Sequence, residues 1–459
     1  MYFIFATFAL LIYFYSTSLL FFLLLWYNFF GDFMNVIIKP KKSINGKFLI
    51  PSDKSISHRA VMLGSIANGR TEIENFLESA DCLATIDCFR KMGINIFFEN
   101  KKLIVEGKGL HGLKPPSSNL DVKNSGTTMR LISGILSGQN FDVEITGDES
   151  IKKRPMDRII TPLTKMGADI KGKSSKFAPL KIKPSPLNGI NYELPVKSAQ
   201  VKSAILFASL YANGQTMVIE PSPTRDHTEI MLEAFGADIK KIGTKIISNP
   251  IGELIAQKII VPSDFSSAAY FIAMALVLEN SHIVLENIGV NPTRIGLIHA
   301  LCEMGADINI LNNRKVCGEM VADIEVKSSK LRGIKIGGDI IPIMIDEIPI
   351  FAVIALFANG KTIIENAEEL MVKESNRIFA MVTELKKMGA NIEATPDGMI
   401  ISGTHTSLKG ANLESYGDHR IAMSLAVAGM KANSEIIIKN ADCVDVSFPD
   451  FFKKIELGN

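Results

Sequence analysis

Apolar and polar positions alternate along most of the chain with two periods, which follow each other in a fixed order. Windows with apolar residues three and four positions apart predict amphipathic helices, and short runs of alternating apolar residues predict strands. Segments rich in Asn, Gly and Asp separate them, as is typical of turns. The pattern therefore predicts an α/β protein built from many short helices and strands.

Two short phrases repeat along the chain. A polar turn followed by a strand-like run returns six times, about 70 residues apart. These copies cover residues 67–75, 137–145, 212–220, 279–287, 358–366 and 432–440. In five of the six units a phrase resembling Met-Gly-Ala-Asp-Ile follows, at 91–96, 165–170, 234–239, 303–308 and 387–392. An amphipathic helix precedes its glycine, which suits a helix C-cap, so each unit reads as helix, turn, strand, helix, glycine and hairpin.

Six similar units predict two globular domains of three units each, because a single core rarely grows beyond about 250–300 residues. We expect residues 53–257 to form the N-terminal half, with repeats 1–3. Residues 34–52 and 258–459 together are expected to form the C-terminal half, with repeats 4–6. The functional site should then lie in the cleft between the halves.

Residues 1–33 differ from the rest of the chain. They contain nine Phe, the only Trp and no charge before Asp32. The run is long enough to span a bilayer, but it lacks the basic start and cleavage site of a signal peptide. We expect an apolar N-terminal extension that arises from a misassigned start, with Met34 as the working start. Membrane contact is expected only if the extension is expressed.

Composition and charge narrow the classes of function. A net charge of +2 gives no broad basic surface, so nucleic-acid binding is not expected and an anionic ligand must meet a local cluster. The five cysteines show no spacing typical of metal ligands, and no metal site is expected. Scattered cysteines of this kind indicate a reducing compartment, here the cytoplasm.

Two motifs place small and basic residues where helices begin. In the segment 51–59, Asp53 or Ser55 can cap a helix whose free N–H groups attract anions beside Lys54 and Arg59. In the segment 124–130, Gly126 allows a ligand to approach the backbone. Each motif alone fits an ordinary capped helix equally well.

Three further motifs follow in the same half. The segment 147–156 contains three consecutive cations that end at Arg154, and its position directly after a repeat strand favours an anion clamp over a solvated charge run. The segments 197–202 and 225–229 occupy corresponding places in the third unit and also read as polar helix starts.

The C-terminal half contains acids in unusual places. Asp346 and Glu347 interrupt an otherwise apolar run, where burial should raise a carboxyl pKa towards the range of a general base. In the segment 373–377, Glu374 lies between two cations that share one helical face. The segment 417–420 adds another arginine beside His419, which alone is more often structural than catalytic.

Taken together and in this order, the motifs resemble those of the 5-enolpyruvylshikimate-3-phosphate synthase family from Met34 to the end of the chain. Four signatures resemble the second class of that family, at 53–55, 198–202, 225–229 and 291–294. Ser52 replaces the usual Gly, and Val446 stands where the first class has a lysine. Gly126 is retained where some glyphosate-tolerant members have a bulkier residue.

The resemblance implies a two-domain repeat fold and a reaction between two anions. Members of the family transfer the enolpyruvyl group of phosphoenolpyruvate to the 5-hydroxyl of shikimate 3-phosphate and release phosphate through a tetrahedral intermediate. The reaction leads to chorismate and the aromatic amino acids. No cofactor is implied, and we expect a monomer. The two substrates carry about six negative charges, which clustered lysines and arginines offset.

The resemblance also implies roles for individual residues. Shikimate 3-phosphate would be bound by Lys54, Ser55, Arg59, Ser198, Ala199, Gln200, Arg225, Asp346 and Lys373. Phosphoenolpyruvate would be bound by Lys54, Gly126, Arg154, Gln200, Arg377 and Arg420. Asp346 would take the proton of the 5-hydroxyl, and Glu374 with Lys54 would move a proton on and off the methylene carbon.

Two alternatives remain at this stage. The enolpyruvyl transferase that acts on UDP-N-acetylglucosamine shares the repeat fold, but it normally has a cysteine in the loop at 147–155, and none is present. A catalytically inactive, membrane-tethered or anion-binding regulator would fit the apolar start of the chain. Asp346 and Glu374 argue against it, because an anion binder needs no such acids. A phosphate-release assay with both substrates discriminates among the three.

Overall fold

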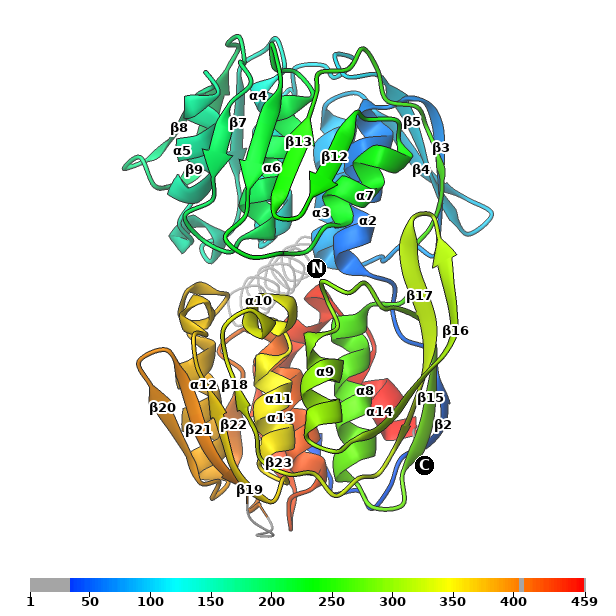
Figure 1. Ribbon diagram of the computed structural model, residues 1–459, viewed down its shortest axis with the longest axis vertical. Coiled ribbons are helices and arrows are strands. Elements are labelled where there is room, and N and C mark those ends of the chain that lie inside the picture. The colour runs from blue at the N-terminus through cyan, green and yellow to red at the C-terminus, as the bar shows by residue number, and fades with distance from the viewer. Residues whose placement is uncertain (1–33, 404–407, 458–459) are drawn as a thin grey trace, which may run out of the picture.

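The computed structural model describes residues 34–403 and 408–457. They form two lobes, one above the other in Figure 1, each with a hydrophobic core of its own. One core contains residues between Ile56 and Val261, and the other joins Ile38, Ile44 and Ile50 to residues from Phe265 onward. The predicted extension at 1–33 lies outside the described residues. In the described part of the chain, no helix is long and apolar enough to cross a membrane.

The N-terminal lobe contains three four-stranded sheets. Its strands are β3 (Asn68–Glu74), β4 (Asn95–Glu99), β5 (Lys102–Lys108), β6 (Leu120–Asp121), β7 (Val143–Thr146), β8 (Asp169–Lys173), β9 (Phe177–Lys183), β10 (Asn191–Glu193), β11 (Thr216–Ile219), β12 (Ile239–Ile242), β13 (Lys245–Ser248) and β14 (Lys258–Ile260). Its helices are α2 (Lys54–Ile66), α3 (Ala80–Lys91), α4 (Gly126–Ser137), η1 (Ile151–Lys153), α5 (Asp157–Lys165), α6 (Ala199–Ser209) and α7 (His227–Ala234). The strand orders are β14-β3-β5-β4, β6-β7-β9-β8 and β10-β11-β13-β12.

The C-terminal lobe contains two four-stranded sheets and one three-stranded sheet. Its strands are β1 (Val36–Ile38), β2 (Asn45–Phe48), β15 (His282–Gly289), β16 (Asp307–Val316), β17 (Glu319–Lys327), β18 (Lys335–Ile336), β19 (Gly360–Ile364), β20 (Ile392–Thr395), β21 (Gly398–Gly403), β22 (Asn412–Glu414) and β23 (Ile436–Lys439). Its helices are α8 (Phe265–Val277), α9 (Gly296–Glu303), α10 (Ile340–Met344), α11 (Ile348–Ala355), η2 (Glu368–Val372), α12 (Arg377–Lys387), α13 (His419–Met430), η3 (Ala441–Val446) and α14 (Phe451–Leu457). The strand orders are β16-β17-β15-β2, β18-β19-β21-β20 and β1-β23-β22.

The six predicted repeats are confirmed, with one added element. Each unit contains one further strand, which the predicted unit lacked. In four units it leads and pairs in parallel with the next strand, as β6 does with β7, whereas β3 pairs with β14 and β15 pairs with β2, both supplied at the lobe crossings. These strands contain only two to four residues, too few for a periodic signal. The predicted helix-ending glycines are confirmed, because Gly93, Gly167, Gly236, Gly305 and Gly389 all have φ between 83° and 104°.

The chain crosses between the lobes twice, and the two crossings lie side by side. Ser52 forms an antiparallel bridge with Ser263, and the N–H groups of Asp53 and Asp264 each donate across the bridge at 2.7 Å. On either side the lobes exchange strands, because β2 pairs with β15 and β14 pairs with β3. The predicted domain boundary between residues 257 and 258 stays a proposal. Because β14 pairs with β3 of the N-terminal lobe, we would place the boundary after β14 rather than before it.

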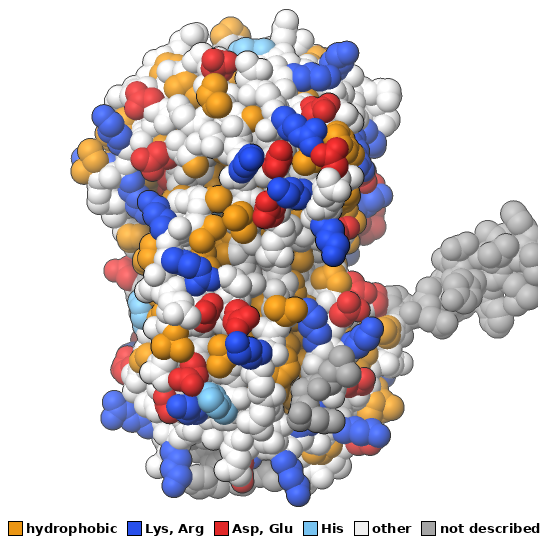
Figure 2. Space-filling model, turned by 90° about the vertical axis from the view of Figure 1, so that its right-hand side faces the viewer, with side chains coloured by type: hydrophobic (Ala, Val, Ile, Leu, Met, Phe, Trp, Pro, Cys, Tyr) orange, Lys and Arg blue, Asp and Glu red, His pale blue; other side chains and the backbone are white. Residues whose placement is uncertain are grey.

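Three buried helices form the centre of each lobe. In the N-terminal lobe they are α2, α4 and α6, and in the C-terminal lobe α8, α11 and α13. The sheets cover their outer sides (Figure 1). On the face shown in Figure 2, basic and acidic side chains are interspersed. The free N–H groups where these helices begin are a further feature that can attract anions.

Candidate active site

Residues at or next to the N-termini of all six central helices line one cleft between the lobes. The N-terminal lobe contributes Lys54 and Ser55 of α2, Gly126, Thr127 and Arg130 of α4, and Ser198 to Val201 at α6. The C-terminal lobe contributes Asp264 and Ser266 at α8, Asp346 before α11, and His419 and Arg420 of α13. Helix N-termini carry free N–H groups and positive partial charge. A cleft with six of them suits an anionic ligand.

Most of these helices begin at a side-chain cap, which explains the motifs. Asp53 accepts from the N–H of Ile56 at 2.8 Å, and Ser125 accepts from that of Thr128 at 3.1 Å. Ser198, Asp264 and Asp418 cap α6, α8 and α13 in the same way. The polar motifs at these five caps therefore fix where a central helix begins, and with it the side chains of the first turn.

Of the residues assigned from the sequence, all except Arg59 line this cleft. The guanidinium of Arg59 is buried and donates to Thr228 at 2.7 Å and Ser203 at 3.0 Å. Of the three consecutive cations, only Arg154 lines the cleft, and Lys152 pairs with Glu149 at 2.9 Å. The predicted clamp is thus reduced to one arginine.

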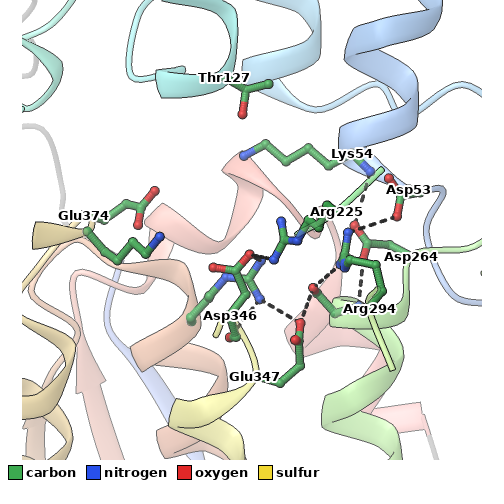
Figure 3. Close-up of polar contacts among 12 residues, drawn as sticks. Asp53, Lys54, Thr127, Arg225, Asp264, Arg294, Asp346, Glu347 and Glu374 are labelled. Carbon is green, nitrogen blue, oxygen red and sulfur yellow. Dashed lines mark hydrogen bonds and ion pairs between the residues drawn. The ribbon is translucent and has the colours of Figure 1, made fainter. Parts of the chain in front are cut away.

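Basic and acidic side chains meet across the cleft. Nη1 of Arg154 lies 3.3 Å from Oε1 of Glu374, and Arg225 pairs with Asp346 (Figure 3). Arg377 contacts both acids, at 2.6 Å from Glu374 and 3.3 Å from Asp346. The two predicted catalytic acids therefore share one cluster with arginines from both lobes.

Lys54 reaches into the space between Thr127 and these acids (Figure 3) and pairs with Asp81. Nearby, Gln200 donates to Thr127 at 3.2 Å and accepts from Arg130 at 2.5 Å. These contacts connect the beginning of α2 to α3 and the beginning of α6 to that of α4 on one side of the cleft.

Comparison with known proteins identifies the family. A family model described as EPSP synthase (3-phosphoshikimate 1-carboxyvinyltransferase) matches residues 38–455. The chain belongs to the EPSP synthase family. A relative from Thermoanaerobacter sp. (strain X514), named 3-phosphoshikimate 1-carboxyvinyltransferase, is 54% identical over 92% of this chain and 100% of its own length. A relative of the same name from Alkaliphilus metalliredigens is 51% identical over 90% of this chain and 97% of its own.

Solved structures agree with this assignment. An EPSP synthase from Acinetobacter baumannii is 46% identical, with a TM-score of 0.83 over 93% of this chain and 98% of that chain. The resemblance to the family and the predicted two-lobed repeat fold are both confirmed by these matches, and the assignment to the second class stays a prediction.

The charges in the cleft of this EPSP synthase family member correct one prediction. Burial was expected to raise the pKa of Asp346. Burial does act in that direction, but the charges of Arg225, Arg420, Lys373 and Arg377 outweigh it and hold the pKa of Asp346 well below its usual range. The carboxylate is therefore ionised at neutral pH.

Glu374 shows the same balance. Burial acts to raise its pKa, but Arg377 and Arg154 hold the pKa of Glu374 well below its usual range. In contrast, burial together with Arg420 lowers the pKa of His419 to about 3. His419 is therefore neutral at physiological pH and adds no charge to the cleft.

Several cleft residues were not assigned from the sequence. They include Asp81, Thr127, Arg130, Arg158, Tyr270, Arg294, Glu369 and His419. Arg130 could have been found, because it lies one helical turn after Gly126 in a motif that was singled out. A Cβ at Gly126 would lie 3.1 Å from Nη1 of Arg154 and 3.3 Å from Nη1 of Arg130. Gly126 thus leaves room for the two arginines.

Within residues 34–403 and 408–457, no group of three or more His, Cys, Asp or Glu could hold a metal ion. The chemistry considered below uses side chains of this chain.

Proposed function

We propose that the cleft binds shikimate 3-phosphate and phosphoenolpyruvate together and that Asp346, Glu374 and Lys54 carry out the proton transfers. As a member of the EPSP synthase family, the protein transfers the enolpyruvyl group of phosphoenolpyruvate to the 5-hydroxyl of shikimate 3-phosphate and releases phosphate. The step belongs to the shikimate pathway. The observation that carries the assignment of residues is that two half-buried acids and arginines of both lobes converge on six helix starts.

The two substrates divide the cations of the cleft between them. We assign shikimate 3-phosphate to the residues predicted for it that line the cleft, which are Lys54, Ser55, Ser198, Ala199, Gln200, Arg225, Asp346 and Lys373. Arg59 does not line the cleft, but it stabilises the backbone of this site, because its Nη1 donates to the carbonyl oxygen of Ser55 at 2.9 Å. We assign phosphoenolpyruvate to Lys54, Gly126, Arg154, Gln200, Arg377 and Arg420, to which Arg130 is added. Forked guanidinium groups suit its carboxylate and phosphate.

The ion pairs of the cleft define how binding activates the acids. Before the substrates bind, Arg225 pairs with Asp346 and Arg154 with Glu374. When these arginines turn to the substrate anions, their pull on the carboxylates weakens and the carboxylates become stronger bases. Binding of the substrates therefore prepares both acids for proton transfer.

The proton steps follow from this arrangement. Asp346 takes the proton of the attacking 5-hydroxyl, while the Lys54 ammonium gives a proton to the methylene carbon of phosphoenolpyruvate. The tetrahedral intermediate then loses phosphate as Glu374 removes a proton from the new methyl group. Oriented arginines and helix N-termini stabilise the charge that develops, and no cofactor is required.

We also propose that the enzyme acts as a cytoplasmic monomer. Every residue assigned to the substrates comes from one chain. All five cysteines are free, as a reducing compartment favours.

Phosphate release by purified variants tests the assignment. We expect Asp346→Ala to lower kcat by about 10²- to 10⁴-fold and to raise KM much less, because a general base acts in the transition state. Lys54→Met should abolish turnover while the protein stays folded. Lys152→Met serves as the control, since Lys152 pairs with Glu149 outside the cleft.

A near wild-type rate for Asp346→Ala would remove the base assignment. Replacing shikimate 3-phosphate by UDP-N-acetylglucosamine should give no phosphate.

A further inference from the structure

Arg294 is a buried arginine at the point where the two lobes meet. Only 3% of its surface is exposed, although it borders the cleft. Nη1 lies 3.7 Å from Oδ2 of Asp53, and Nη2 lies 3.5 Å from Oδ1 of Asp264 (Figure 3). These aspartates cap α2 and α8, the first central helices of the two lobes. Arg294 therefore connects the beginnings of one helix from each lobe.

The same guanidinium is linked to the neighbour of the proposed base. Nη2 of Arg294 donates to Oγ of Ser266 at 2.6 Å, and Ser266 donates to Glu347. Glu347 is 1% exposed and directly follows Asp346. A short path of polar contacts thus runs from Arg294 to the backbone that holds the proposed base.

The proposed acid Lys54 is linked to the same group through its backbone. The N–H of Lys54 donates to Oδ2 of Asp264 at 3.2 Å, and Arg294 holds the other oxygen of that carboxylate. Burial acts to lower the pKa of Arg294, but Asp53, Asp264 and Glu347, with a smaller contribution from Asp346, outweigh burial and raise it. The guanidinium therefore stays charged over the whole pH range in which the enzyme can work.

We propose that Arg294 is a positioning residue that fixes Lys54 and Asp346 relative to each other across the lobes. The inference rests on the catalytic roles proposed above for these two residues. The transfer needs the ammonium within reach of the methylene carbon and the carboxylate within reach of the 5-hydroxyl in the same complex. Misplacement by about 1 Å can lower the rate about 10²-fold even when it arises away from the reacting atoms.

A purely structural role predicts a different outcome. Arg294 could merely compensate the buried acids Asp53, Asp264 and Glu347, in which case its loss would destabilise the fold without changing the reaction of folded molecules. The ratio of the effects on kcat and on KM separates the two roles. Misplaced catalytic groups lower kcat while substrate binding, which depends on other side chains, is retained.

Three variants and one control form the test. Steady-state phosphate release is measured for Arg294→Met, Arg294→Lys and Ser266→Ala, per folded enzyme and well below each melting temperature. Arg314→Met is the matched control, because Arg314 also lies near an aspartate, Asp323 at 3.7 Å, but outside the cleft. We expect Arg294→Met to lower kcat about 100-fold and to change both KM values less than about threefold.

The conservative variants make the test independent of folding. Only Nη2 of Arg294 has a hydrogen-bond acceptor among the described residues, so a lysine ammonium can replace much of its function. Arg294→Lys should have a kcat at least about tenfold higher than that of Arg294→Met. Ser266→Ala, which keeps the charge of Arg294, should lower kcat about three- to tenfold relative to wild type. The control should keep the wild-type rate.

The inference is overturned if folded Arg294→Met retains wild-type kcat or, where that variant does not fold, if Ser266→Ala does. It is also overturned if the variants change only the melting temperature. If instead the proposed catalytic role of Lys54 is wrong, Lys54→Met will retain turnover, which distinguishes that outcome from failure of the positioning role. If Lys54→Met is inactive and the Arg294 variants are as fast as wild type, only the positioning role is wrong.

Discussion

The lobes meet at two places, and the polar contacts at these places differ in burial and in partners. The hinge consists of the crossings 51–53 and 262–264 and the tip of the β16–β17 hairpin. Its residues Ser52, Asp53, Ser263, Asp264 and Glu319 are each less than 10% exposed. At the cleft, Arg154, Arg158 and Arg225 face acids of the other lobe, with side chains 10% to 30% exposed. Both are contacts between lobes. Of the two crossings only Asp264 lines the cleft, whereas all three arginines of the second set do.

The hairpin tip shows how the hinge is built. In Figure 1 the hairpin extends past the crossings to the N-terminal lobe. There Glu319 lies 2.7 Å from Nδ1 of His227 and accepts from Asn291 at 3.0 Å. These groups have fixed partners of their own and lie beside a backbone bridge. A buried polar contact of this kind stabilises one arrangement of the lobes, since its parts cannot separate without loss of the bond.

The cleft pairs have partners that can be replaced. Substrate phosphates and carboxylates offer arginines the same bidentate contacts as Glu374, Asp346 and Glu369 do. Exchange of partners costs little, because the pairs are partly solvated. The hinge therefore stabilises the fold, whereas the cleft pairs hold cations ready for the substrates. Each of the following predictions tests one side of this difference.

The largest effect is expected in the cleft, for Arg154→Ala. We expect kcat/KM for phosphoenolpyruvate to fall about 10³-fold, because a forked, charge-assisted contact is lost. The free energy of unfolding should change by less than about 1 kcal/mol, because Glu374 retains its ion pair with Arg377 at 2.6 Å. Urea unfolding and phosphate release measure the two quantities. A stability loss of several kcal/mol would show that the cleft pairs resemble the hinge contacts.

An intermediate effect is expected at the hinge, for Glu319→Gln. Burial acts to raise the pKa of Glu319, but His227 and Asn291 outweigh it and leave the pKa below its usual value. A carboxyl whose folded-state pKa is depressed stabilises the fold above its unfolded-state pKa, and this contribution is lost as the pH falls through the folded-state pKa. We expect a loss of about 1–3 kcal/mol at neutral pH that shrinks in acid.

Urea unfolding as a function of pH measures this loss, and Glu325→Gln is the control. Glu325 lies on the same strand β17 and contacts His282 at 2.8 Å, but that histidine is half exposed. The kcat/KM of Glu319→Gln should stay within about threefold of wild type. A loss of stability that does not depend on pH, or equal losses in both variants, would contradict the distinction between buried and exposed pairs.

Local signals in the sequence predict much of this arrangement. Asp53, Ser125 and Ser198 could be predicted as possible helix caps because capping depends on neighbouring residues, and the glycines after the amphipathic helices for the same reason. Whether a capped helix begins in a cleft or at the surface is not a local property. The repeats and the family resemblance supplied that step.

The electrostatic part could not be predicted in this way. The pKa of Asp346 was expected to rise, because the apolar run around it indicated burial and nothing nearby indicated arginines. Arg225, which reverses the shift, lies 121 positions away along the chain. Arg294 was likewise quoted only as part of a signature, since its contacts with Asp53 and Asp264 exist only in the folded chain. Charge balance in a buried site depends on which distant segments meet there.

The smallest effect is expected at the rim of the cleft, for Arg158→Gln. Nη1 of Arg158 lies 2.9 Å from both carboxylate oxygens of Glu369, but both side chains are about one-third exposed. Exposed pairs contribute about 0–1 kcal/mol, so the free energy of unfolding should change by less than about 1 kcal/mol. Small-angle scattering of the substrate-free enzyme should instead show more open lobes. High salt should open the wild-type lobes in the same way, because salt screens the same pair. Glu369→Gln should open the lobes equally. If Arg158→Gln loses several kcal/mol of stability and the lobes stay closed, then the rim pair acts as a hinge contact does, and partial exposure does not distinguish the two regions.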